Sequence, residues 1–369
     1  MPKKILFYNS YEECRKAFLN ATQEIKSLQT SFEVIPVNKS ENGLYTDISY
    51  FKNEGKNPLV IITSGLHGIE GYVGSALQLS LLKQIGNEVI DISGIDLLFV
   101  HAINPWGFKN NRRVTRNNVD LNRNFSMTED LFQIKNDGYS KIRSILEPIK
   151  KYSRRSLEHF TFLLKILKCI QKYSKATLIQ AIGEGQYDFE KGIIFGGKAY
   201  EEENVNITDV LKRYCALYDK ILIIDLHTGL GNRGKLQLLN APKVPYQVKQ
   251  QVNELFENRV IDDSDDNFFK EHGSFLDFAW NINKEKTCLP VMFEFGTVNS
   301  ANIFGALRTL KTMIVENQAY QNGCKTSQDK AYIERIFLDM FYPKEEVWRK
   351  EVIKQFDETI NKAISKLKN

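Results

Sequence analysis

Short, nearly continuous apolar runs are the feature that most constrains how this chain can fold. Each is rich in β-branched or aromatic side chains, and the clearest are LVIIT at 59–63, IDLLFV at 95–100, ILIIDL at 221–226 and LPVMFEF at 289–295. Runs of this length and composition are typical of strands that are buried on both faces of a parallel or mixed sheet.

Helical patterns lie between these runs. Segment 73–85 (VGSALQLSLLKQI) repeats apolar residues at the spacing of one helical face, and 252–260 and 301–315 are similar. Strands that alternate with helices predict an α/β protein: a three-layer α/β/α fold around a mixed, mostly parallel central sheet.

One region departs from this alternation. Residues 127–181 are rich in Lys, Leu and Ile at helical spacing and carry no strand signal, which predicts a helical insertion. It could be a lid or rim over the sheet, or a structural excursion with no role at a site. The tail 328–369 is also helical and amphipathic. Since no Pro/Gly-rich linker divides the chain, we expect one catalytic domain over 1–369.

Composition excludes several classes of protein. Fifty basic residues face forty-five acidic ones, and no basic run is interleaved with aromatics, so no nucleic-acid partner is expected. The five cysteines are scattered and form no CxxC pair, so no disulfide framework is expected. Without a signal-peptide pattern or an apolar run long enough for a membrane span, we expect a cytoplasmic protein with no membrane partner. Its oligomeric state stays open.

The first candidate for chemistry is TSGLHGIEG at 63–71. A buried strand ends just before it and a helix begins just after Glu70, so His67 and Glu70 lie at the carboxyl edge of the sheet, where ligands of open α/β sheets bind. Both side chains are good zinc ligands, and their spacing lets them face one point. Alone, however, the pair is a weak signal.

A second strand end strengthens the case for a metal site. The run 221–226 leads directly into His227 and then a glycine. Two histidines and a glutamate that leave a position open are a catalytic rather than a structural zinc set, which predicts one Zn²⁺ per chain on His67, Glu70 and His227. Asp225 points to the same face as His227 if the strand extends that far, so it could orient that imidazole.

Two further features fit such a site. Residues 112–125 (RRVTRNNVDLNRNF) crowd four arginines and four asparagines into one loop, and arginine forks bind carboxylates and oxyanions. Glu294 is an acid within an otherwise apolar strand. Because an unpartnered buried carboxylate is costly, it should lie near the metal and act as a general base, or pair with an arginine for structure.

In order and context, His67-x-x-Glu70, the DLNRNF phrase at 120–125, His227 and Glu294 resemble the zinc carboxypeptidase family. The phrases SGLHGIEGYVGS and RRVTRNNVDLNRNF are similar to a bacterial branch of that family known mainly as a domain of unknown function. The resemblance covers about 59–297 and implies a zinc-carboxypeptidase-like fold.

The resemblance also implies roles for individual residues. Asp120 would orient the first zinc histidine, and Asn122 and Arg123 would hold the terminal carboxylate of the substrate. Arg113 would polarise the scissile carbonyl, although Arg112 or Arg116 could fill that place. Glu294 would be the general base. The implied activity is zinc-dependent hydrolysis of a peptide or other amide bond next to a free carboxylate.

Two departures from the family pattern concern the substrate. Ile69 stands where the digestive members carry an arginine, and the stretch His272-Gly-Ser-Phe275 replaces their mobile tyrosine. One alternative is therefore an N-acyl amino acid deacylase, similar to aspartoacylase and succinylglutamate desuccinylase. A second alternative is a binding protein of the same fold without catalysis. The expected partner is a peptide or acyl-amino-acid substrate with a free carboxylate.

Overall fold

The chain is described by a computed structural model, over residues 6–26, 29–37, 43–261, 271–300 and 302–368. These residues form one eight-stranded sheet in the order β1-β2-β4-β3-β5-β8-β6-β7. Neighbours from β4 through β3 and β5 to β8 are parallel, and antiparallel pairs flank them. The strands are β1 (Gln29–Pro36), β2 (Tyr45–Lys52), β3 (Leu59–Ser64), β4 (Asp96–His101), β5 (Lys220–Gly229), β6 (Leu236–Asn240), β7 (Val260–Ile261) and β8 (Thr287–Gly296).

The four apolar runs are the four central parallel strands, as predicted. Alternate residues of β3 face opposite sides: Val60 and Ile62 belong to one apolar cluster, and Leu59 and Ile61 to another. These four side chains are fully buried, because helices cover both faces of the sheet.

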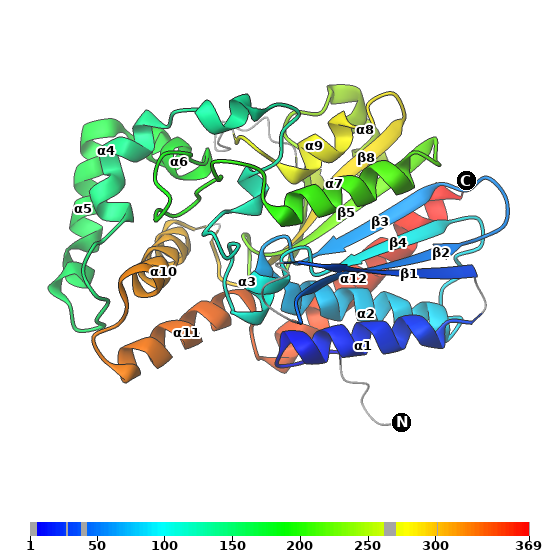
Figure 1. Ribbon diagram of the computed structural model, residues 1–369, viewed down its shortest axis with the longest axis horizontal. Coiled ribbons are helices and arrows are strands. Elements are labelled where there is room, and N and C mark those ends of the chain that lie inside the picture. Colours follow the sequence, from blue (N-terminus) through cyan, green and yellow to red (C-terminus); the bar gives the residue numbers. More distant parts are fainter. Residues whose placement is uncertain (1–5, 27–28, 38–42, 262–270, 301, 369) are drawn as a thin grey trace.

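The helices form the two outer layers (Figure 1). Helices α1, α2 and α12 pack on one face of the sheet, and α7 and α9 pack on the other. The predicted three-layer α/β/α fold with a mixed sheet is therefore confirmed. These helices are α1 (Tyr11–Glu24), α2 (Gly71–Gly86), α7 (Glu202–Cys215), α9 (Phe275–Asn281) and α12 (Glu346–Leu367).

Further helices lie beyond the carboxyl ends of the central strands, to the left in Figure 1. Residues 127–181 contain helices and no strand among their described residues, and α10 and α11 lie below them in this view. The elements are η3 (Glu129–Gln133), α4 (Asp137–Leu146), α5 (Leu157–Tyr173), α6 (Lys175–Gly183), α10 (Ile303–Asn322) and α11 (Ser327–Phe341).

Two predicted helices differ in their bounds. The helix expected at 252–260 is α8 (Tyr246–Leu255), and Val260 instead begins β7. Glu257 and Asn258 have φ of 60° and 58°, and this left-handed backbone ends a right-handed helix. The helix expected at 301–315 is α10; its cap Asn302 accepts a hydrogen bond from the Gly305 amide, and residue 301 lies outside the described residues.

The strand register brings the candidate residues to one edge. Strands β3, β5 and β8 are consecutive neighbours, with Ser64 beside Leu226 and His227 beside Glu294. Residues that follow these strands therefore meet at the same end of the sheet. All five cysteines are free. Among the described helices, none combines the length and apolar character that a membrane crossing requires.

Candidate metal centre

His67 and Glu70 sit in a tight connection between β3 and α2. His67 precedes the short helix η1 (Gly68–Glu70), which runs directly into α2. The backbone amide of Gly68 donates to the Arg113 carbonyl, so this connection is fixed to the arginine-rich loop. A Cβ on Gly68 would lie 2.2 Å from the Gly107 backbone, so only glycine allows this approach.

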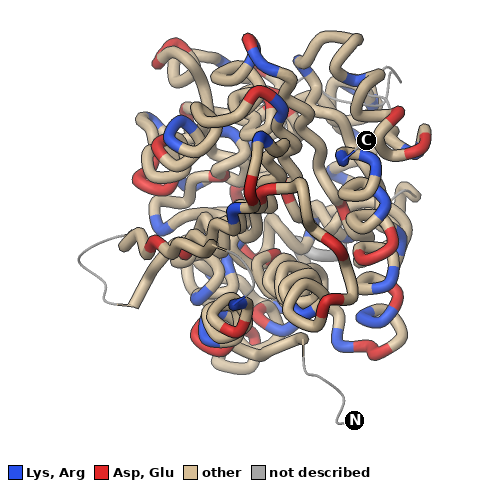
Figure 2. Tube along the Cα trace, turned by 90° about the vertical axis from the view of Figure 1, so that its right-hand side faces the viewer, with Lys and Arg blue, Asp and Glu red and all other residues tan. Residues whose placement is uncertain are grey.

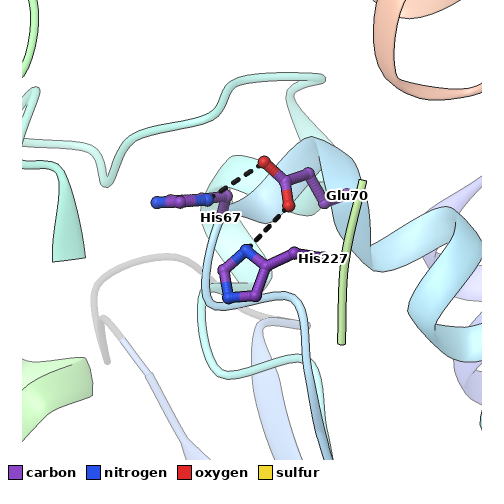
Figure 3. A group of neighbouring side chains, drawn as sticks. All are labelled: His67, Glu70 and His227. Carbon is purple, nitrogen blue, oxygen red and sulfur yellow. Dashed lines mark hydrogen bonds and ion pairs between the residues drawn. The ribbon is translucent and has the colours of Figure 1, made fainter. Parts of the chain in front are cut away.

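His227 completes a group of three side chains with His67 and Glu70 (Figure 3). Their ligand atoms lie within 4.8 Å of one another, and all three residues are buried. One Glu70 oxygen lies 3.0 Å from Nδ1 of His67, and the other lies 2.9 Å from Nδ1 of His227. The Thr228 amide donates to Glu70 at 3.0 Å and fixes the carboxylate further.

The other nitrogen of each imidazole faces an aspartate. His67 Nε2 lies 3.0 Å from Asp120, and His227 Nε2 lies 2.6 Å from Asp225. Thr63 donates from Oγ1 to Asp225 at 2.6 Å and holds that carboxylate in place. If each Nε2–H is donated to its aspartate, a neutral imidazole keeps the Nδ1 lone pair for a metal, which is the arrangement that metal-binding histidines adopt.

The balance of charge fits a cation at this point. Four buried carboxylates, those of Glu70, Asp120, Asp225 and Glu294, gather where Arg113 supplies one positive charge. Uncompensated buried charges are costly, so either protonated imidazoles or a bound divalent cation must balance them. The residues present, two imidazoles and a carboxylate, are those of an open zinc site.

The pKa values of Glu70 and His227 reflect the closeness of these charged groups. Burial alone would raise the pKa of Glu70, but charged His67 and the hydrogen bond and charge of His227 hold it well below its usual range. Burial would lower the pKa of His227, yet the charge of Asp225 and the hydrogen bonds to Asp225 and Glu70 raise it well above its usual range. The raised pKa of His227 thus reflects the carboxylates that surround it.

Glu294 lies beside His227 in the parallel ladder of β5 and β8. The Leu230 amide donates to one of its oxygens at 2.8 Å. Burial first, and then the negative charge of Glu70, raises the pKa of Glu294 to about 8. A carboxyl group with a pKa this far from its ordinary value has the property of an acid–base residue.

The structure separates the three candidate arginines. Arg113 forms an ion pair with Asp120, and its Nε lies 4.0 Å from Glu70. Arg112 points away from this group, because it pairs with Glu316 at 2.7 Å and lies over the ring of Tyr320. Arg116 is exposed. Arg113 thus lies against the carboxylates around the two histidines, whereas Arg112 is engaged elsewhere.

Asn122 and Arg123 lie in the next turn, η2 (Leu121–Arg123), and are buried. The Asn122 side-chain oxygen accepts from the Phe275 amide at 2.9 Å. Arg123 donates to the Gly183 carbonyl at 2.8 and 3.2 Å and pairs with Glu271 at 2.9 Å. Both side chains are thus engaged by protein groups in this structure.

The two departures from the family pattern have structural counterparts. Ile69 is fully buried in an apolar cluster with Phe337, Met340 and Phe341 of α11. The stretch that begins at Glu271 packs on the arginine loop: Gly273 has φ of +73°, and its carbonyl accepts from the Phe125 amide.

Glu271 and the amides of Thr228 and Leu230 are the contacts that sequence reasoning missed. A backbone amide donor cannot be recognised from the sequence, because every residue except proline carries one. For Glu271 the available signal was its place immediately before His272-Gly-Ser-Phe275, in the stretch already noted as unusual.

Comparisons with known proteins gave weak structural similarities and one family. No curated protein matches the chain. Carboxypeptidase A of Helicoverpa armigera is 15% identical, with TM-score 0.49 over 91% of this chain and 75% of that one. Bovine thrombin-activatable fibrinolysis inhibitor, solved with a tick carboxypeptidase inhibitor, is 11% identical, with TM-score 0.49 over 90% and 99%.

Murein-tripeptide amidase MpaA of Escherichia coli O157 is 13% identical, with TM-score 0.36 over 79% of this chain and 95% of that one. A family described as "Protein of unknown function (DUF2817)" matches residues 7–355, and the chain belongs to this family.

Proposed function

We propose that this chain is a zinc-dependent hydrolase that cleaves an amide bond next to a free carboxylate. The main support is the convergence of His67, Glu70 and His227 on one point, with the buried acid Glu294 on the adjacent strand. A binding protein without catalysis would have no need of a buried carboxyl group whose pKa lies near 8.

His67, Glu70 and His227 would hold the zinc, and Asp120 and Asp225 would orient the two imidazoles. When bound, zinc supplies Lewis-acid chemistry: it polarises a carbonyl oxygen and makes water more acidic. The local excess of carboxylates favours such a dication over a monovalent ion.

Glu294 would act as the general base. Its carboxylate accepts a proton from the attacking water as the new C–O bond forms, and returns that proton to the amine nitrogen as the C–N bond breaks. The Leu230 amide holds one of its oxygens in place. Arg113, beside Glu70, would stabilise the negative charge on the former carbonyl oxygen.

Asn122 and Arg123 would hold the free carboxylate, but Arg123 already pairs with Glu271. This observation favours a second candidate, an N-acyl amino acid deacylase whose recognised carboxylate lies on the acyl side of the amide. The two candidates share the metal, the base and the oxyanion-stabilising arginine.

A substrate screen on the zinc-loaded protein separates them. It compares dipeptides, N-acyl amino acids and muropeptides, each with its carboxylate free or amidated, and uses Glu294→Gln as the inactive control. Cleavage only beside a free C-terminal carboxylate supports the peptidase, and cleavage that depends on an acyl-side carboxylate supports the deacylase. No cleavage of any substrate by the zinc-loaded protein would contradict both.

A further inference from the structure

A large cavity lies between α10 and α11 at the end of β8. Its volume is about 1060 Å³, the size of a site for a substantial ligand. Thr297, Val298 and Asn299, which follow Glu294 closely in the chain, form part of its lining. Arg233, from the loop after β5, also lines it and donates to the Thr297 carbonyl. The loops that follow two strands of the candidate site thus also bound this cavity.

A shared apolar wall connects the cavity with the metal loop. Val298 and Met340 line the cavity, and both pack in the cluster that buries Ile69, the residue immediately before Glu70. Phe341 of the same cluster accepts, through its carbonyl, a hydrogen bond from Thr228, the residue after His227. The cavity and the candidate metal centre therefore lie on either side of this apolar cluster.

The charge around the cavity is one-sided. Six basic side chains line it and only two acidic ones, Asp339 and Glu345. Arg233 pairs with Glu345 at 2.8 Å. Arg308, Arg335 and Lys344 are exposed, and no ion pair is found for them within the described part of the chain. The basic residues are Arg154, Arg233, Arg308, Lys311, Arg335 and Lys344.

The opposite end of the molecule shows the contrast. On the side that faces the viewer in Figure 2, basic and acidic residues are interspersed. Like charges held around one concave site repel one another, and a concave shape concentrates their field on whatever enters. This arrangement favours an anionic ligand over a neutral or cationic one.

We propose that this cavity binds the acyl side of the substrate, and that this part is a flexible chain with two or more carboxylates, such as an acidic peptide. The inference rests on the proposed hydrolase function and specifies its substrate class. Arg123 is bound at Gly183, where α6 ends, and at Glu271, just before α9. Figure 1 places α6 and α9 above α10 and α11, so the cavity and Arg123 serve different ends of the substrate.

Binding to the zinc-loaded full chain tests this without relying on turnover. The probes are acetyl-Glu-Glu-Glu-Glu and acetyl-Gln-Gln-Gln-Gln, titrated calorimetrically into the Glu294→Gln protein. The acidic peptide should bind at least about tenfold more tightly, and the difference should shrink between about 20 mM and about 500 mM salt, because salt screens exposed charges. Equal affinity for the two peptides would overturn the proposal.

Charge reversal locates the binding. Arg308→Glu with Arg335→Glu should weaken the acidic peptide by at least about tenfold and leave the neutral one within about twofold. The matched control, Lys16→Glu with Lys52→Glu, makes the same change in net charge on exposed residues of α1 and β2 and should change neither affinity. Circular dichroism and zinc content confirm that each variant folds. An equal effect of the two double variants would show that net charge, not the cavity, is responsible.

Two further outcomes are decisive. If inorganic pyrophosphate binds in a manner lost with Arg308→Glu and Arg335→Glu while the acidic peptide does not bind, the ligand class is wrong. If the acidic peptide binds as expected but the wild-type zinc protein hydrolyses no amide, the cavity assignment holds and the proposed hydrolase fails. The two hypotheses can therefore fail separately.

Discussion

Two halves of the candidate site differ in how their polar groups are satisfied. In the half formed by β3, β5 and β8, the ligand atoms of His67, Glu70 and His227 face one another and leave negative charge in excess. In the half formed by the arginine loop, Arg123 and Asn122 are matched by carbonyls, an amide and Glu271. The first half gathers more carboxylates than cationic side chains, whereas the polar groups of the second are paired within the protein.

The difference shows what each half can do unaided. An excess of buried carboxylates favours a cation beside them, because the fold already meets the cost of burying those charges. Because the Arg123 guanidinium is already paired with Glu271, a substrate carboxylate could bind it only by displacing the Glu271 carboxylate. If the proposed roles hold, the first half needs no rearrangement to bind zinc, and the second must release Arg123 from Glu271 to bind a carboxylate.

Removal of a metal ligand tests the first half and should have the largest effect. Purified protein should hold close to one zinc per chain. His67→Ala or His227→Ala should lower zinc affinity by more than about hundredfold, beyond the effect expected of Asp225→Asn, which alters only the orientation of an imidazole. Metal analysis checks this, and full zinc occupancy in both alanine variants would sink the assignment.

Replacement of the base separates metal binding from chemistry. Glu294→Gln keeps the shape of the side chain and removes its proton chemistry, so turnover should fall by about 10² or more. Zinc content and substrate affinity should stay unchanged, as equilibrium dialysis and titration would measure. Unchanged turnover would mean that Glu294 is not the base.

Arg123 tests the second half. A charged, bidentate hydrogen bond contributes roughly 1.5–3 kcal/mol, so Arg123→Ala should reduce kcat/KM at least about tenfold on carboxylate substrates and little on amidated ones. Arg123→Lys should recover only part of the loss, because a point charge cannot reproduce the planar fork.

If Arg123 only supports the loop through Glu271 and Gly183, the result differs. Stability and zinc affinity would then fall, and both substrates would suffer equally. That outcome would remove the role of Arg123 in substrate binding and leave the zinc hydrolase standing.

The metal half could be predicted from the sequence and the state of the other half could not. His67, His227 and Glu294 lie in or directly after apolar runs, and the period of those runs reveals strands whose carboxyl ends meet at one edge. The pairing of Arg123 with Glu271 joins two loops far apart in the chain. Loops have no period, so nothing in the sequence announces that contact.

Glu271→Gln tests whether the second half is closed by competition. The change removes the carboxylate that pairs with Arg123 and keeps a hydrogen-bonding side chain in its place. If a substrate carboxylate must displace Glu271, KM for carboxylate substrates should fall by roughly threefold to tenfold, with kcat almost unchanged. Initial rates on the free and amidated substrates measure this. A KM that rises on both would show that Glu271 supports the site rather than competing for it.

The smallest expected effect concerns stability, and its sign separates the two halves. In the metal-free protein the pKa of Glu294 is raised by burial and by Glu70 to about 8, whereas an unfolded glutamate titrates near 4.5. The folded state therefore binds more protons between these values, and the stability that the protonated group provides is lost as pH rises through about 8.

Glu294→Gln cannot become charged, so chelated protein with this change should be almost as stable as wild type at about pH 5 and more stable than it at alkaline pH. Glu271→Gln should instead destabilise the protein by about 1–3 kcal/mol at neutral pH, because it leaves Arg123 buried without its partner charge. Urea unfolding at the two pH values measures both. If Glu294→Gln raises stability and Glu271→Gln lowers it, Glu294 is buried at a cost to stability, whereas Arg123 and Glu271 form a stabilising pair. Changes of the same sign would remove this distinction between the two halves.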